Sequence, residues 1–129
     1  MQTTPLQVLV VEDDVDAAES LAALLDMDGH ATQIAHDGLE ALDAARRFLP
    51  DVVLIDLGLP GLDGCNVATQ IRREPTFDRT LLVALTGWGR EADKQAALAA
   101  GFDLHLLKPV GWDALREVLT RVEPRDRCA

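Results

Sequence analysis

Five short apolar segments, separated by longer stretches of helical periodicity, constrain the fold of this chain more than any other feature of its sequence. Residues 6–11 and 52–55 are almost continuously apolar and do not alternate apolar with polar residues. This pattern is typical of strands that helices cover on both faces, as in a parallel sheet. We therefore expect parallel strands at residues 6–11, 31–35, 52–55, 81–85 and 104–107, with the less apolar segment 31–35 near a sheet edge.

Each expected strand is followed by a segment in which apolar residues recur at spacings of three and four, as on one face of a helix. Leu21 and Leu25 show this spacing in the first segment. Gly29 and Gly101 can close the first and fourth helices, and Pro50 ends the second. We expect helices at residues 14–28, 38–49, 63–74, 90–100 and 111–122.

The order of strand and helix, repeated five times, predicts an α/β fold with parallel strands and right-handed crossovers. Five units are too few for an eight-stranded barrel, so we expect an open, doubly wound sheet with helices on both faces. The chain has 129 residues and no linker-like stretch. We expect one domain over residues 1–129, with its core at about 6–122 and no output domain.

The charge balance disfavours two classes of partner. The chain has 22 acidic and 12 basic residues, and its net charge of −10 argues against binding to nucleic acid or to an anionic membrane. No signal peptide or membrane-spanning segment is recognisable, so we expect a cytoplasmic protein. Cys65 and Cys128 lack metal-ligand and C-x-x-C spacing, which predicts free thiols. His30, His36 and Cys65 are expected to be structural or surface residues.

Acidic side chains follow two of the expected strands. Glu12, Asp13 and Asp14 come after the first strand, and Asp56 comes after the third. Ligands of open α/β sheets bind at the carboxyl edge, where residues distant in sequence converge. Neighbouring carboxylates repel one another, and a divalent cation relieves the repulsion; all-oxygen ligation suits Mg²⁺. We expect Glu12, Asp13 and Asp56 to share a Mg²⁺ site and Asp14 to cap the following helix.

Thr86 and Lys108 end the fourth and fifth expected strands at the same edge. A lysine at the end of an apolar strand is costly unless it is paired, and the carboxylates offer partners for Lys108. The Thr86 hydroxyl can hydrogen-bond an oxygen of a transferred group. Taken singly, Thr86 also fits a helix-capping or turn residue and Lys108 a solvated surface lysine, so it is their joint position that favours a site.

Four motifs resemble the receiver domain of two-component response regulators. They are VVEDD at residues 10–14, DLGLPGLDG at 56–64, LTG at 85–87, and AGF at 100–102 continuing to Lys108-Pro109. They have the family's order and spacing and together span nearly the whole chain. The resemblance implies a flavodoxin-like (βα)5 doubly wound sheet with strand order 2-1-3-4-5. Residues 85–89 and 105–110 are similar to those of receivers attached to hybrid histidine kinases.

The resemblance also implies roles for individual residues. Asp56 matches the phosphoacceptor, and Glu12 and Asp13 match the acidic pair that holds Mg²⁺ with it, assisted by the backbone carbonyl of Gly58. The phosphoryl donor would be a phosphohistidine on a sensor or hybrid histidine kinase or on a histidine phosphotransfer protein. Such a chain catalyses its own phosphorylation and dephosphorylation and is not a conventional turnover enzyme.

Other positions match the switch of the family. Thr86 matches the hydroxyl that turns toward the phosphoryl group, and Lys108 matches the lysine that pairs with that group, in a Lys108–Pro109 bond that is often cis. His105 stands where the family usually has Tyr or Phe, and is either a switch residue or a packed or surface histidine. Trp88 either overhangs the site and slows hydrolysis or is a partly exposed loop residue.

Three rival functions are open at this stage. A Mg²⁺-dependent phosphatase with an Asp nucleophile would need a second acid at the position of Gly58, and a flavin carrier would have its phosphate repelled by Glu12 and Asp13. The third rival is a receiver-like module that binds partners without phosphorylation. Within the favoured class, the chain relays the phosphoryl group or binds an unidentified downstream protein, with residues 90–122 as the partner surface. We expect a monomer.

Overall fold

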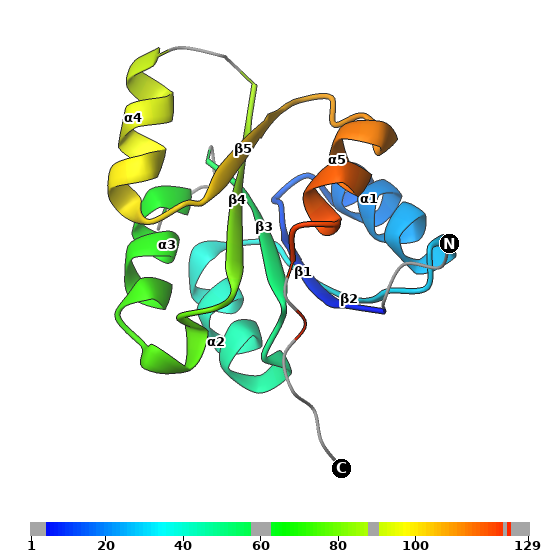
Figure 1. Ribbon diagram of the computed structural model, residues 1–129, viewed down its shortest axis with the longest axis horizontal. Coiled ribbons are helices and arrows are strands. Elements are labelled where there is room, and N and C mark those ends of the chain that lie inside the picture. Colours follow the sequence, from blue (N-terminus) through cyan, green and yellow to red (C-terminus); the bar gives the residue numbers. More distant parts are fainter. Residues whose placement is uncertain (1–4, 58–62, 88–90, 123, 125–129) are drawn as a thin grey trace.

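Five parallel strands form one sheet in the chain: β1 (Gln7–Val11), β2 (Ala31–Ala35), β3 (Val52–Asp56), β4 (Leu81–Thr86) and β5 (Leu104–Leu107) (Figure 1). They run in the order β2-β1-β3-β4-β5, so the predicted fold class and strand order are confirmed. The computed structural model describes residues 5–57, 63–87, 91–122 and 124, without the side chains of residues 91–93.

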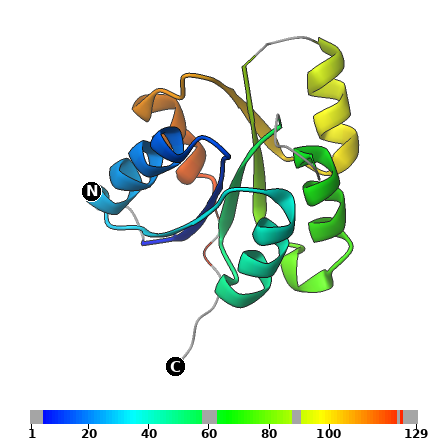
Figure 2. The same cartoon turned by 180° about the vertical axis from the view of Figure 1, so that it is seen from behind.

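Helices cover both faces of this sheet, as Figure 1 and Figure 2 show from opposite sides. On one face lie α1 (Val15–Met27) and α5 (Trp112–Leu119). On the other lie α2 (Gly38–Phe48), α3 (Gly64–Arg72) and α4 (Glu91–Ala100). Among the described residues, none of the helices combines the length and the hydropathy that a membrane-spanning segment requires.

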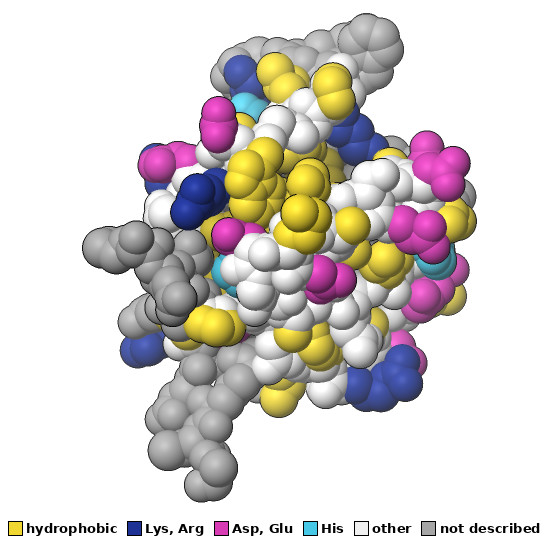
Figure 3. Space-filling view, turned by 90° about the vertical axis from the view of Figure 1, so that its right-hand side faces the viewer, with side chains coloured by type: hydrophobic (Ala, Val, Ile, Leu, Met, Phe, Trp, Pro, Cys, Tyr) yellow, Lys and Arg dark blue, Asp and Glu magenta, His cyan; other side chains and the backbone are white. Residues whose placement is uncertain are grey.

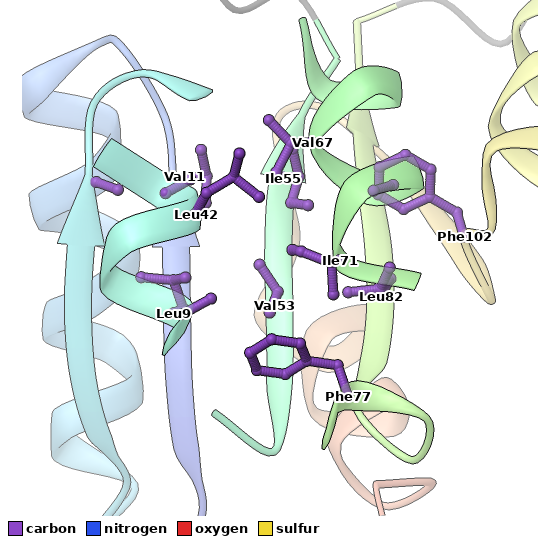
Figure 4. Close-up of a cluster of buried hydrophobic side chains, with 14 of the residues drawn as sticks. Leu9, Val11, Leu42, Val53, Ile55, Val67, Ile71, Phe77, Leu82 and Phe102 are labelled. Atoms are coloured by element: carbon purple, nitrogen blue, oxygen red, sulfur yellow. The ribbon is translucent and has the colours of Figure 1, made fainter. Parts of the chain in front are cut away.

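The central strands are buried on both faces, which explains their continuous apolar sequence. In β3, Val53 and Ile55 pack among residues of α2 and α3, whereas Val52 and Leu54 pack among residues of α1 and α5. Figure 4 shows the first of these two clusters, which includes Phe77. The edge strand β2 is partly exposed, as its weaker apolar pattern predicted.

Most helix ends lie close to their predicted positions. Gly29 follows α1 with a φ of 92°, a left-handed conformation that favours glycine. Two helices end earlier than predicted: α5 ends at Leu119, and α3 ends at Arg72, after which Pro75–Phe77 form a separate 3₁₀ turn. Proline is favoured in a first helical turn, where its missing N–H costs nothing, so it starts this new turn and does not extend α3.

His30 is a structural residue, as expected. Its side chain is fully buried, and its Nδ1 accepts a hydrogen bond of 3.0 Å from the backbone N–H of Leu6. Its Nε2 lies 3.1 Å from a carboxylate oxygen of Asp28. The imidazole thus ties the segment between α1 and β2 to the segment that leads into β1.

Gly64 begins α3 where the helix comes closest to the end of β3. A Cβ at this position would lie 2.7 Å from the carbonyl oxygen of Asp56 and 3.0 Å from Cα of Leu57. Both contacts involve backbone, which cannot rotate away as a side chain does. A glycine here therefore lets the helix pack directly against the strand that carries Asp56.

We predict that Gly64→Ala lowers the free energy of unfolding by about 1 to 3 kcal/mol, the usual cost of overpacking. Urea unfolding followed by circular dichroism measures this loss. Gly87→Ala is the matched control, because nothing lies within 4 Å of a Cβ at Gly87. Equal unfolding free energies for the two variants would show that the close approach of α3 to β3 is not a constraint.

Candidate functional site

The register of the sheet brings the predicted site residues to one edge. Val11 pairs with Ile55, so Glu12 and Asp56 follow side by side at the ends of β1 and β3. Asp56 and Thr86 are the last residues of β3 and β4, each strand being one residue longer than predicted. Lys108 follows β5, and its backbone N–H donates a hydrogen bond of 2.7 Å to the carbonyl of Thr86.

Three carboxylates converge at this edge. Ligand oxygens of Glu12, Asp13 and Asp56 all lie within 4.8 Å of one another. The Glu12 side chain is only 5% exposed and that of Asp56 only 12%, whereas Asp13 is exposed. Asp13 has no hydrogen-bond or ion-pair partner among the described residues, so its oxygens are open to a ligand from solvent.

Lys108 bridges the two buried carboxylates. Its Nζ lies 2.8 Å from Oε2 of Glu12 and 3.1 Å from Oδ2 of Asp56. Lys108 and its partner Glu12 are 96 positions apart in the sequence. A buried charge without a partner is strongly destabilising. The positive charge of Lys108 therefore explains why two carboxylates can be buried at this edge of the sheet.

Burial raises the pKa of the Glu12 carboxyl above its ordinary value. The hydrogen bond from Lys108 opposes this rise, and the hydrogen bonding and charge of Asp56 add to it. Burial alone would lower the pKa of Lys108, but the hydrogen bonds to Glu12 and Asp56 and their charges outweigh burial and raise it. One lysine thus neutralises the acidic cluster incompletely, and a further cation would find favourable electrostatics there.

The donor set of the cluster fits a hard divalent cation. Glu12, Asp13 and Asp56 offer carboxylate oxygens, and the residues of the cluster include neither sulfur nor imidazole. Mg²⁺ prefers oxygen ligands and keeps several of its waters, so a site with one exposed carboxylate suits it. The predicted further ligand, the carbonyl of Gly58, lies outside the described residues.

The remaining predicted residues have different surroundings. The Thr86 residue is 6% exposed and stands on the strand next to Asp56. His105 is exposed on β5 and pairs with Ala84, so the described structure does not bring it into the carboxylate cluster. The Lys108–Pro109 bond is cis, as the resemblance implied. Trp88 and Cys128 lie outside the described residues.

A groove that the sequence did not reveal adjoins the carboxylates. It has a volume of about 470 Å³ and lies between α1, the end of β4 and the segment after β5. Figure 3 faces the side of the molecule that carries α1 and α5, and hydrophobic side chains gather near its middle. The apolar walls come from Ala17, Leu21, Leu24, Leu85, Pro109 and Val110, and Glu12, Asp14 and Lys108 lie at the end toward the site.

The sheet order and the residues at its carboxyl edge place the chain among the receivers of two-component signalling. The chain belongs to the response regulator receiver domain family, whose model matches residues 8–120.

Relatives with known names agree with this assignment. Response regulator MprA of Mycobacterium avium (strain 104) is 37% identical over 125 residues, which make up 94% of this chain and 54% of MprA. The chain therefore spans about half the length of that relative.

Solved structures are similar over most of their length. The receiver domain of the sensor histidine kinase PA1611 from Pseudomonas aeruginosa PAO1, with a magnesium ion in its active-site cleft, has a TM-score of 0.84 and 30% identity, covering 92% of this chain and 98% of that one. The receiver domain of Saccharomyces cerevisiae Ssk1, crystallised with the histidine phosphotransfer protein Ypd1, has a TM-score of 0.82 and 30% identity, covering 90% and 87%.

We predict that Mg²⁺ stabilises this domain and that Asp13→Asn abolishes the effect, because the variant removes a carboxylate from the cluster. A free concentration tenfold above Kd should raise the unfolding free energy by about 1.4 kcal/mol. Urea unfolding with MgCl₂ and with EDTA measures the difference.

Asp14→Asn is the control for charge. Asp14 lies next in sequence but caps α1, its Oδ1 accepting hydrogen bonds from the N–H groups of Asp16 and Ala17. Asparagine caps helices as well as aspartate does. This variant should keep the Mg²⁺ response, and a response lost equally in both would mean that Mg²⁺ acts only through overall charge.

Proposed function

We propose that the chain is a phosphoacceptor receiver in which Asp56 takes a phosphoryl group from a phosphohistidine, with Mg²⁺ held by Glu12, Asp13 and Asp56. The observation that carries this proposal is the placement of Lys108, whose Nζ lies 2.8 Å from Glu12 and 3.1 Å from Asp56 within the carboxylate cluster. Phosphoryl transfer depends mainly on positioning and charge neutralisation, and these residues can supply both.

In the proposed transfer, an Oδ atom of Asp56 attacks phosphorus in line with the departing histidine. A P–O bond to Asp56 forms, the P–N bond breaks, and the imidazole nitrogen leaves with the electron pair of that bond. When bound, Mg²⁺ supplies positive charge to the phosphoryl oxygens. Lys108 exchanges its contact with the Asp56 carboxylate for one with a phosphoryl oxygen. Water later attacks phosphorus, which releases phosphate and restores Asp56.

Thr86 and the elements beyond it provide the proposed response to phosphorylation. The Thr86 hydroxyl would donate a hydrogen bond to a phosphoryl oxygen. The backbone carbonyl of Thr86 accepts a hydrogen bond from the backbone N–H of Lys108. Leu98, His105 and Leu107 are exposed on α4 and β5, which supports residues 90–122 as the surface for a downstream protein. Phosphorylation would shift a pre-existing equilibrium between two shapes of this surface. The involvement of His105 stays a prediction.

The decisive experiment is intact mass spectrometry after incubation with acetyl phosphate and Mg²⁺. The parent should gain about 80 Da, the mass of one phosphoryl group, and EDTA or Asp56→Asn should abolish the gain. Asp63→Asn is the matched control, because Asp63 caps α3 through the N–H of Asn66 and asparagine keeps that role. No gain in the parent would favour the phosphorylation-independent module.

The groove beside the site is the proposed docking place of the phosphohistidine donor. It opens next to Glu12 and Lys108, and the sequence has no Lys or Arg before Arg46, so α1 itself carries acidic side chains and no basic ones. Apolar walls with an acidic margin fit a helix whose apolar ridge is flanked by Lys or Arg. The Ssk1 receiver, crystallised with the phosphotransfer protein Ypd1, supports a donor of this class.

We predict that Leu24→Glu slows phosphoryl transfer from a histidine phosphotransfer protein about tenfold, because it places a charge in the apolar groove. Phosphorylation by acetyl phosphate, which needs no docking, should stay unchanged. Leu39→Glu is the control, since Leu39 is also exposed but lies on α2 away from the groove. Equal transfer rates for the two variants would place the donor on another surface.

A cytoplasmic location and a monomeric state stay predictions.

A further inference from the structure

His36 lies directly after β2, beside the residues that would hold the metal. Its Nδ1 lies 3.0 Å from the backbone carbonyl oxygen of Glu12, and its side chain is partly buried. A carbonyl oxygen can only accept, so Nδ1 carries the proton and donates it in this hydrogen bond. The contact joins the end of the edge strand to the loop that carries Glu12 and Asp13.

The hydrogen bond from His36 gives the Glu12 carbonyl a donor that the pairing of β1 with β2 does not supply. The N–H of Glu12 donates to the carbonyl of Ala35 at 2.9 Å, which continues the pairing of β1 with β2. Beyond Ala35 the chain leaves the sheet, because Asp37 caps α2 and accepts a hydrogen bond from the N–H of Glu40. The imidazole of His36 therefore satisfies the Glu12 carbonyl at the point where the two strands diverge.

A fixed orientation of the Glu12 carbonyl also restricts the position of the Asp13 backbone. The carbonyl of Glu12 and the N–H of Asp13 belong to one planar peptide unit, so the direction of this carbonyl sets the position of the Asp13 Cα. On its other side, Asp13 is joined to Asp14, whose side chain caps α1. The Asp13 side chain itself has no partner among the described residues, so only its backbone is held.

We propose that His36 is a positioning residue that orients Asp13 toward a divalent cation through the Glu12–Asp13 peptide. This inference rests on the proposed function, because it assigns to His36 a role at the proposed Mg²⁺ site. Residues that hydrogen-bond behind a metal ligand commonly tune affinity without touching the ion.

His36→Leu removes the donor, and His36→Asn keeps one in the same place, since the asparagine Nδ2 is bonded to Cγ as the histidine Nδ1 is. Titration calorimetry with MgCl₂ should give a Kd about tenfold weaker for His36→Leu than for the parent. His36→Asn should bind within about twofold of the parent. Urea unfolding in EDTA gives the stability of each protein without metal.

The outcomes separate the two proposals. A parent that binds no Mg²⁺ overturns the proposed metal site and this inference with it. A parent that binds Mg²⁺, with the same Kd in both variants, overturns only the role of His36, whatever the variants' stability. Affinity lost equally in His36→Leu and His36→Asn also overturns it, because the donor would then not be what matters. Loss in His36→Leu with recovery in His36→Asn supports it.

Discussion

The ion pairs of Lys108 with Glu12 and Asp56 are the interaction on which the site depends, since they hold two desolvated carboxylates in one place. The sheet makes this possible, because its hydrogen-bond ladder puts the ends of β1 and β3 side by side and brings the chain after β5 back to them. The central strands are buried on both faces by two separate hydrophobic clusters, which gives the charged edge a rigid support. The buried apolar residues that stabilise the fold and the polar residues that form the site are thus neighbours on the same strands.

Sequence reasoning succeeded where one physical rule governs many residues. Continuous apolar runs predicted buried parallel strands, and the convergence of strand ends predicted that Glu12, Asp56 and Lys108 would meet. It was less accurate at helix ends, because the third and fifth helices stop at Arg72 and Leu119, before their predicted ends at residues 74 and 122. The cis Lys108–Pro109 bond and strand order came from the family resemblance, because no periodicity in the chain encodes them.

Two features of the site escaped the sequence because they depend on tertiary contacts. His36 was predicted to be a structural or surface residue, because the residues next to it in the sequence do not indicate a hydrogen bond to a backbone carbonyl 24 positions away. The groove was missed because Leu21 and Leu24 in α1 fit the apolar face of any packed helix. Only the packed structure shows that this face is not fully covered, with Leu24 still 39% exposed. Predicting the contact of His36 or the groove would require knowing which segments of the chain are neighbours in space.

The contacts of Lys108 with Glu12, Asp56 and Thr86 offer a route by which a change of charge at Asp56 would affect residues outside the site. An acyl phosphate carries more negative charge than the carboxylate it replaces, and its oxygens lie farther from β3. Lys108 contacts both Glu12 and Asp56, so a negative charge that moves outward at Asp56 also changes the ion pair of Lys108 with Glu12. The N–H of Lys108 is bonded to the carbonyl of Thr86, and therefore any displacement of the lysine backbone acts on β4 directly. The exposed side chains of α4 and β5 lie beyond this connection, so the proposed phosphorylation of Asp56 would reach them through Thr86 and β4.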